Sequence, residues 1–319
     1  MIPLTRFLST AALLAVSLAP QDAEKQPAHR QEGPAAKPRE TSLPPAGAKI
    51  PFQLAKTRPV PVLQAKIDGK GPFSFLFDTG ASGYVLDEAF VKSIGLELGR
   101  EQPIGDPSNS SPIVAHEVSL ASIELGGTTF RGVTAVAMDR SRFDAGEDLK
   151  GVLGLPLFED VLFTLDYPAG QIVLAKGELP APGEGADRAG VLAYDAKGQL
   201  PRIELALDGK KILAHLDSGS PGGWTFPKSF LEGAKWKDEP KVVGRGRTVN
   251  GEFEVWSGKI AGTLRLGPIE VLEPDVNFND RFPFANVGYR ALRDYAVTFD
   301  QKNHRMRLEK KERRAEGQR

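Results

Sequence analysis

Two segments of the sequence each place an aspartate directly after an apolar run and before a hydroxyl residue and a glycine. The segment "FSFLFDTG" carries Asp78, and the segment "ILAHLDSG" carries Asp217. A carboxylate buried beside a strand costs free energy unless it is paired, hydrogen-bonded or used in chemistry. Two carboxylates that meet in one site can act as general acid and general base. One Asp-(Ser/Thr)-Gly triplet is weak support for a catalytic site on its own, so the hypothesis of a carboxylate pair depends on whether the two segments meet.

The two segments occupy matching positions in an internal repeat. The stretch "VLQAKIDGKGPFSFLFDTG" aligns with "RIELALDGKKILAHLDSG", with one residue fewer before the second aspartate. Farther along, residues 151–176 align without a gap on residues 285–310. The matched pairs are Gly154 with Gly288, Asp160 with Asp294, Thr164 with Thr298 and Asp166 with Asp300. The chain is therefore a tandem duplication, and halves related by a two-fold axis would bring Asp78 and Asp217 to face each other.

The elements that must position these residues are short strands separated by turns. The 319-residue chain contains 34 Gly and 25 Pro, which favours an all-β fold with few short helices. Asp-Gly dipeptides follow "VLQAKI" and "IELAL", and such dipeptides are typical of tight hairpin turns. Short helices are expected at 87–95 and 227–233, because each stretch ends at a glycine. These patterns predict two β-rich lobes of roughly 120 residues each.

Composition excludes several classes of function. The chain has no Cys, which excludes disulfides, thiolate catalysis and Cys-ligated metals. Its formal net charge is +0 at pH 7, so nothing recommends nucleic acid or an anionic membrane surface as a partner. The histidines are few and scattered, and the glycine-serine segments lack the Gly-x-Ser-x-Gly spacing of a nucleophile elbow. We therefore expect no metal, no cofactor and no serine-hydrolase site.

The N-terminus predicts export. The segment "MIPLTRFLSTAALLAVSLA" combines Arg6 with a short apolar run and small residues at its end, which is typical of a secretory signal. The run is too short for a stable membrane span. We expect a periplasmic or extracellular protein, attached to the membrane only if this segment stays uncleaved. Pro20 leaves the cleavage site open.

The rest of the chain divides by composition. The stretch after the signal is rich in Pro, Ala and charge, which is typical of a disordered tether. It lacks the basic, partly helical character of an inhibitory propeptide, so we expect no zymogen step. The predicted organisation is a signal peptide at 1–19, a tether at 20–48, a first lobe at 49–178, a linker at 179–189, a second lobe at 190–310 and a charged tail at 311–319.

The motifs resemble those of the aspartic peptidases. "FLFDTGAS" and "VLG", followed by the repeated "HLDSGS" and "NVG", are similar to the bacterial branch of this family that resembles retropepsins. Two retropepsin-type halves would be fused in one chain, as in pepsin. The resemblance covers about residues 55–310. It implies two tandem β-barrel lobes related by a pseudo-two-fold axis, a monomer, and a peptide or protein substrate bound between the lobes.

The resemblance also implies roles for individual residues. Asp78 and Asp217 would be the catalytic pair, which shares a proton and activates a water molecule held between the two carboxylates. The Thr79 and Ser218 hydroxyls would each bond the backbone of the opposite lobe. The residues that would support the pair are Thr79, Gly80, Ser218, Gly219, Ser220, Gly154 and Gly288.

The sequence departs from the family pattern at several positions. Ala81 stands where the second half has Ser220, and in the family a hydroxyl there donates to the catalytic carboxylate. Its loss raises the pKa of the pair, so we expect a pH optimum less acidic than that of pepsin. Pro221 could distort its loop, Asn286 replaces the usual apolar residue, and His215 is expected to be a packing residue.

The hairpins that could cover a substrate are less well defined. The first half offers 104–118, which has no Tyr, and the second half offers 244–256, which turns at Asn250-Gly251 and carries Trp256. One or both could cover the cleft.

Three functional hypotheses follow. The first is a secreted aspartic endopeptidase. The second is a catalytically weak or inactive peptide-binding protein on the same scaffold, suggested by Pro221 and Asn286. The third is an enzyme acting on non-peptide or very restricted substrates, since a fold does not determine its function.

Overall fold

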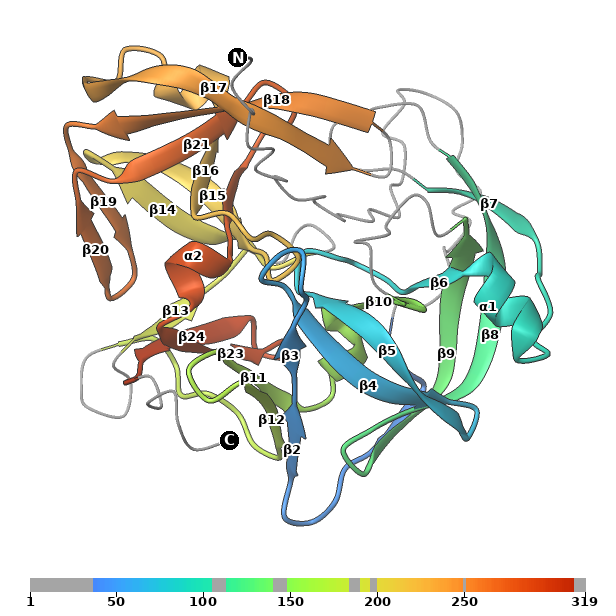
Figure 1. The fold of residues 1–319 in the computed structure, drawn as a ribbon. Coiled ribbons are helices and arrows are strands. Elements are labelled where there is room, and N and C mark those ends of the chain that lie inside the picture. The colour runs from blue at the N-terminus through green and yellow to red at the C-terminus, as the bar shows by residue number, and fades with distance from the viewer. Residues whose placement is uncertain are drawn as a thin grey trace, which may run out of the picture.

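The computed structural model describes residues 37–104, 113–139, 148–183, 190–195, 200–248 and 251–312. These residues form three sheets and few short helices (Figure 1), so the prediction of a mostly β chain is confirmed. The predicted signal peptide and residues 20–36 of the predicted tether lie outside the described residues, as do 184–189 of the linker and 313–319 of the tail. Within the described ranges, no helix has the length and apolar character needed to cross a lipid bilayer.

Strands of the first half form a nine-stranded sheet. Along β4, Leu63, Ala65 and Ile67 are buried and alternate with less buried residues, which is the period-2 pattern of a half-buried strand. Strand β8 pairs with β9 as well as with β4. In order across the sheet, the strands are β1 (Glu40–Ser42), β9 (Thr128–Met138), β6 (Val85–Asp87), β10 (Gly151–Gly154), β5 (Lys70–Asp78), β4 (Pro61–Ile67), β8 (Ile113–Leu125) and β7 (Glu101–Ile104), and β3 (Gln53–Leu54) pairs with β4.

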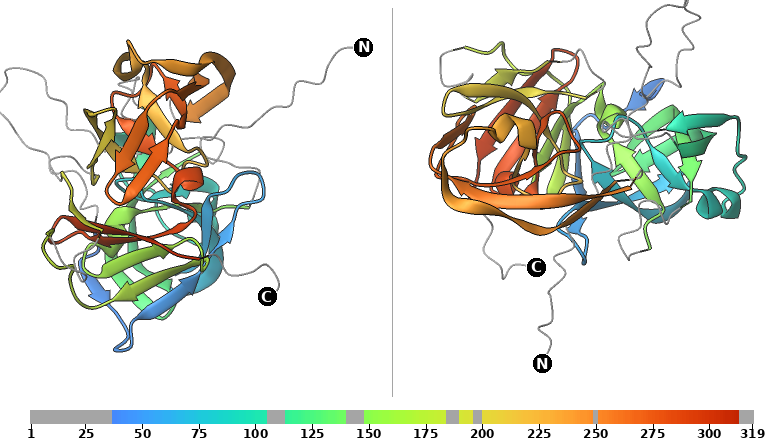
Figure 2. Two further views of the ribbon diagram at one scale, coloured as in Figure 1. Left: turned by 90° about the vertical axis from the view of Figure 1, so that its left-hand side faces the viewer. Right: turned by 90° about the horizontal axis from the view of Figure 1, so that it is seen from above.

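Strands of the second half form another nine-stranded sheet. It lies in a different part of the molecule from the first sheet, as the views in Figures 1 and 2 show. Its strands, in order, are β17 (Trp236–Thr248), β18 (Gly251–Ile260), β21 (Asp275–Asn279), β16 (Trp224–Pro227), β22 (Ala285–Val287), β15 (Lys210–Leu216), β14 (Ile203–Leu207), β19 (Thr263–Leu266) and β20 (Ile269–Leu272).

A six-stranded sheet joins strands from both halves. At its centre β11 pairs antiparallel with β23, with Thr164 opposite Thr298. The two threonine hydroxyls are 2.9 Å apart and hydrogen-bonded. The repeated strands of the two halves therefore meet each other here. In order, the strands are β13 (Val191–Ala193), β24 (Arg305–Lys310), β23 (Tyr295–Asp300), β11 (Leu162–Asp166), β12 (Gln171–Ala175) and β2 (Ala48–Pro51).

The repeat extends to the turns. The predicted Asp-Gly turns place Asp68 at φ 48° and Asp208 at φ 49°, the left-handed conformation that tight hairpin turns require. Each aspartate then caps a neighbouring strand in the same way. Ser122 N donates to Asp68 Oδ1 over 2.7 Å, and Thr263 N donates to Asp208 Oδ1 over 2.8 Å.

The predicted short helices are confirmed. Helix α1 (Glu88–Ser93) begins where the Asp87 side chain accepts a bond from Phe90 N, as an N-cap does. A 3₁₀ helix, η4 (Lys228–Leu231), occupies the second predicted stretch. Gly95 and Gly233, just beyond the two helices, both have φ 76°, which explains why each helix stops at glycine.

The prediction of a disordered tether over residues 20–48 is wrong for its last part. Residues Glu40–Ser42 form β1, which pairs with β9, and β2 begins at Ala48 and pairs with β12. The reason is that backbone hydrogen bonds to a sheet edge can hold a short polar strand in place. Such bonds do not depend on side chains, so the sequence of the strand shows no apolar periodicity.

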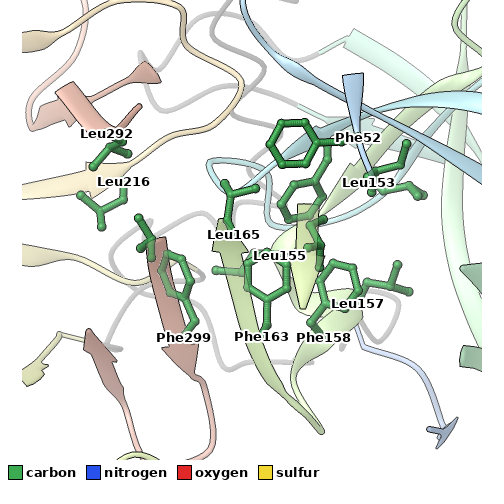
Figure 3. Packing of buried hydrophobic residues seen from close by; sticks show 14 of the residues in the cluster. Phe52, Leu153, Leu155, Leu157, Phe158, Phe163, Leu165, Leu216, Leu292 and Phe299 are labelled. Atoms are coloured by element: carbon green, nitrogen blue, oxygen red, sulfur yellow. The ribbon is translucent and has the colours of Figure 1, made fainter. Parts of the chain in front are cut away.

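One continuous hydrophobic cluster contains buried residues of all three sheets. Phe163 of β11 stacks on Phe158 with 4.6 Å between ring centroids and lies 5.9 Å from Phe299 of β23. Figure 3 shows these rings with Leu216, the residue that precedes Asp217, in the same cluster. The core therefore reaches from the first half, across the six-stranded sheet, to the backbone just before the second aspartate.

Candidate active site

Each aspartate lies at the end of a strand that pairs in parallel with a short strand from the same half. Strand β5 ends at Asp78, and β10 pairs with it in parallel so that Gly154 lies opposite Asp78. Strand β15 ends at Leu216, immediately before Asp217, and β22 pairs with it in parallel so that Val287 lies opposite Leu216. Both aspartates thus leave the end of a buried strand with the same register.

Four hydrogen bonds cross between the two segments. Thr79 Oγ1 donates to Leu216 O over 2.6 Å and accepts from Ser218 N over 2.9 Å. Reciprocally, Ser218 Oγ donates to Phe77 O over 3.0 Å and accepts from Thr79 N over 2.9 Å. All four bonds are buried, so they fix the backbone beside one carboxylate relative to the other.

The two carboxylates lie against each other's loops. A Cβ atom added at Gly80 would be 2.9 Å from Asp217 Cγ, and one added at Gly219 would be 2.5 Å from Asp78 Cγ. Carbon atoms do not approach so closely without a shift, so only glycine leaves room for the opposite carboxylate. Asp78 is 0% exposed and Asp217 is 2% exposed. The structure therefore brings the two aspartates together in one buried site.

Gly154 and Gly288 support the turns that follow the aspartates. A Cβ at Gly154 would lie 2.5 Å from Ala81 O, and one at Gly288 would lie 2.7 Å from Ser220 O. Both glycines have extended backbones, so the close approach of the turn, and not the backbone conformation, requires glycine.

Two backbone hydrogen bonds of the loop that carries Pro221 repeat those of the first half. Ser220 N donates to Asp217 O over 3.3 Å, as Ala81 N donates to Asp78 O over 3.2 Å. The next bond also repeats, because Tyr289 N donates to Ser220 O as Leu155 N donates to Ala81 O. The expected distortion by Pro221 is therefore absent from these bonds.

The side-chain donor to Asp217 differs from the one expected. Asn286 Nδ2 donates to Asp217 Oδ2 over 2.9 Å, whereas the Ser220 hydroxyl accepts from Gly222 N over 3.4 Å. The departure from the family pattern at position 286 thus supplies the contact that a hydroxyl was expected to make. Sequence spacing gave no signal for it, because the contact depends on the pairing of β22 with β15.

Burial dominates the electrostatics of the pair. It raises the pKa of Asp78 well above its usual value, and the negative charge of Asp217 raises this pKa further. Burial also raises the pKa of Asp217, while hydrogen bonds from Asp78, Asn286 and the local backbone lower it. Apart from the partner carboxyl group, none of the described residues donates to Asp78 Oδ2 or Asp217 Oδ1, which are both buried. A proton held by one carboxyl, or a water molecule, would satisfy these two atoms.

Sequence reasoning missed two further residues near the pair. Arg58 is buried in the segment before β4, and its positive charge lowers the pKa of Asp78. Tyr167 follows β11, and its pKa is raised well above the usual value by burial and then by the charges of Asp217 and Asp78. No pattern in the sequence distinguishes these two from ordinary surface or core residues.

His215 is a buried residue that packs against an aromatic ring, as expected. Its ring lies 4.4 Å from the ring centroid of Phe284. Burial lowers the pKa of His215 to about 4, with the charge of Arg202 as a second cause. The imidazole is therefore neutral over most of the pH range in which a carboxyl pair works.

The two predicted covering hairpins differ in how much is described. Residues 105–112 of the first lie outside the described residues. The second is formed by β17 and β18, although Asn250 at its turn lies outside the described residues. Trp256 of β18 stacks on Phe278 with 6.1 Å between ring centroids, so this hairpin is anchored to the sheet below it.

Comparison with known proteins defines the class of the first half. The sequence profile of the aspartyl protease family matches residues 63–157. This segment is an aspartyl protease, retropepsin-like domain, which contains Asp78 and Gly154 and implies a hydrolase of the peptidase class. The match covers less than a third of the chain and does not reach Asp217. A search of curated proteins found no match. Among the described residues, no group of three or more His, Asp or Glu side chains could hold a metal ion.

Proposed function

We propose that this protein is an exported aspartic endopeptidase that hydrolyses peptide bonds with a water molecule activated between Asp78 and Asp217. The observation that carries the proposal is the mutual contact of the carboxylates with Gly80 and Gly219, fixed by the hydrogen bonds of Thr79 and Ser218. The family match supports the reaction class for the first half.

The geometry suits acid–base catalysis. Two buried carboxyl groups in contact cannot both ionise at low cost, so the pair keeps one proton over a range of pH, behaviour for which aspartic peptidases are the standard example. The ionised carboxylate takes a proton from the water, and the neutral carboxyl donates to the peptide carbonyl. Because Ala81 offers Asp78 no hydroxyl donor and burial raises the pKa of this carboxyl, we propose a working range less acidic than that of pepsin.

We propose that the chain consists of two lobes related by a pseudo-two-fold axis, over residues 49–178 and 190–310. Three observations support this arrangement. Thr164 lies opposite Thr298 in the central sheet, the strand pairs β5–β10 and β15–β22 share one register, and the Asp-Gly turns make the same contacts. The pairing of β8 with β9 supports a closed barrel for the first lobe.

The same arrangement supports a proposal for the substrate class. An extended peptide between the lobes would pass the carboxylates, and the β17–β18 hairpin could pair with its backbone. We further propose that the protein acts as a monomer in the periplasm or outside the cell, on the strength of the sequence of residues 1–19.

Two observations weaken the alternative of a binding protein without turnover. Two of the loop bonds around Pro221 repeat those of the first half, and Asn286 bonds a carboxylate instead of leaving it without a side-chain donor. No contact of the described residues favours a non-peptide substrate.

The test compares the purified full chain with its Asp78→Asn and Asp217→Asn variants on a mixed peptide library between pH 3 and 8. We expect cleavage by the wild type and a loss of at least about 10³-fold in either variant. Binding of a pepstatin-type inhibitor by the wild type without any cleavage would instead identify a binding protein. Undiminished activity of Asp217→Asn would show that the second half is only a scaffold.

A further inference from the structure

The two carboxylates have different surroundings although the backbone around them repeats. Four positions in each half are equivalent, because they share the same strand pairing or the same offset from the aspartate. All four are apolar in the first half and all four are polar in the second. They are Leu76, Ala81, Val85 and Val152 in the first half, and His215, Ser220, Thr225 and Asn286 in the second.

The apolar set belongs to one packed cluster. Leu76, Ala81, Val85 and Val152 are each 0% exposed and lie together in the same hydrophobic cluster. None of these side chains can donate a hydrogen bond. The donor to Asp78 among the described contacts is its own loop, where Gly80 N bonds Oδ1 over 2.7 Å. These four side chains would therefore give little stabilisation to a negative charge on Asp78.

The polar set supplies a donor to Asp217. Asn286 of β22 lies opposite His215 of β15 and Thr225 of β16, so β22 is held between these two strands. Its amide donates to Asp217 Oδ2 over 2.9 Å and is buried. A hydrogen bond to a carboxylate is stronger than one to a neutral carboxyl group. Asn286 therefore favours the ionised form of Asp217, which Val152 cannot do for Asp78.

We propose that the singly protonated pair carries its proton on Asp78, and that Asn286 is the positioning residue that determines this assignment. The inference rests on the proposed peptidase function for its catalytic meaning. Asp217 is then the base and Asp78 is the acid, as environments that separate two pKa values would assign them.

Each step of hydrolysis balances under this assignment. Asp217 takes a proton from water as the water oxygen bonds to the peptide carbonyl carbon. Asp78 gives its proton to the carbonyl oxygen, which yields a neutral tetrahedral diol. When the C–N bond breaks, the nitrogen takes the proton held by Asp217, and a diol proton returns to Asp78 as the carbonyl re-forms. The starting protonation of the pair is thereby restored.

Other titratable groups near the pair do not reverse the assignment. Arg58 lowers the pKa of Asp78, but burial and the charge of Asp217 raise it more strongly. His215 is neutral above about pH 4, since burial lowers its pKa to that value. Tyr167 is buried and keeps its proton, because burial raises its pKa.

The direct test does not require activity. The carboxyl carbons of the aspartates are labelled with ¹³C in the full chain, and the Asp78→Asn and Asp217→Asn spectra assign the two signals. On raising the pH from 2, we expect the Asp217 signal to titrate first in the wild type. Titration of Asp78 before Asp217 would overturn the proposal, and this result needs no further variant that might fail to fold.

Exchange of the paired residues tests the part played by Asn286. In Asn286→Val we expect the titration of Asp217 to move up by about 1 to 2 pH units, and the acidic limb of the kcat/KM profile to move with it. In Val152→Asn/Asn286→Val we expect Asp78 to titrate first. An unchanged order in the double variant would contradict the role of Asn286.

The two proposals fail in different ways. If the wild type cleaves no peptide but Asp217 titrates first, the peptidase function is wrong and the asymmetry of the site stands. If peptides are cleaved but Asp78 titrates first, the peptidase function stands and the assignment is wrong.

Discussion

Replacing Thr79 by valine removes a hydroxyl that bonds the opposite segment twice while keeping the shape of the side chain. Leu216 O would lose its donor and Ser218 N would lose its acceptor. Each buried group left without a partner costs about 1 to 3 kcal/mol. Two such groups give an expected loss of about 2 to 6 kcal/mol in the free energy of unfolding.

The matched control is Thr164→Val. Its hydroxyl makes one partly buried bond, to Thr298, in the six-stranded sheet, so we expect a loss of about 1 kcal/mol. Both variants are unfolded in urea and followed by far-UV circular dichroism and by tryptophan fluorescence. All tryptophans lie in the second half, at positions 224, 236 and 256. A change at Thr79 in the first half should therefore shift the fluorescence transition of the second half.

Two results would refute this reasoning. One is a cost for Thr79→Val no larger than that for Thr164→Val. The other is a shifted dichroism transition with an unchanged fluorescence transition, which would mean that the halves unfold independently. A double-mutant cycle with Ser218→Ala measures the coupling, which we expect to be at least about 1 kcal/mol because the two hydroxyls belong to one network.

Three further predictions concern single residues of the site. As the pH falls from 6.5 to about 4, the wild type should lose about 3 kcal/mol of stability, because the folded protein holds His215 neutral while the unfolded chain protonates it. His215→Leu should not show this loss. Urea unfolding at several pH values measures the stability of both proteins, and equal losses would contradict the prediction. Asp78→Asn should have a higher free energy of unfolding than the wild type at pH 8, and a smaller increase or none near pH 4. The reason is that a raised carboxyl pKa costs the folded state about 1.4 kcal/mol for each unit by which it is raised, once the pH is high enough to ionise the unfolded chain. An increase in stability that does not grow with pH would argue against a buried charge. Gly219→Ala should lower kcat by more than about 10²-fold by displacing the Asp78 carboxylate. The control Gly223→Ala should retain activity, because its added Cβ would meet only Arg290 Cβ at 3.8 Å. Similar kcat values for the two variants would contradict the close approach of Gly219 to Asp78.

The sequence was sufficient to predict the features that repeat. The two aspartates, the Asp-Gly turns and the helices that end at Gly95 and Gly233 all follow from local residue chemistry, which acts over a few neighbours. The duplication then made each weak local signal appear twice. For that reason the short helices could be placed correctly even though each is only about one turn long.

The features that were missed depend on contacts between distant segments. Strand β1 exists because the edge of β9 offers backbone partners, and its own sequence carries no apolar period. The role of Asn286 depends on the register of β22, which places its amide beside Asp217. Arg58 and Tyr167 lie outside the named strands, and only the fold brings them near the site.

The central claim is that one chain supplies both carboxylates of a single site. The most direct measurement is the binding stoichiometry of a pepstatin-type inhibitor, by titration calorimetry, on a full chain whose mass in solution is determined by light scattering. We predict one inhibitor per monomer, with binding weakened by both Asp78→Asn and Asp217→Asn. One inhibitor per two chains on a dimer, with undiminished binding to Asp217→Asn, would contradict the account and show that two first halves form the site.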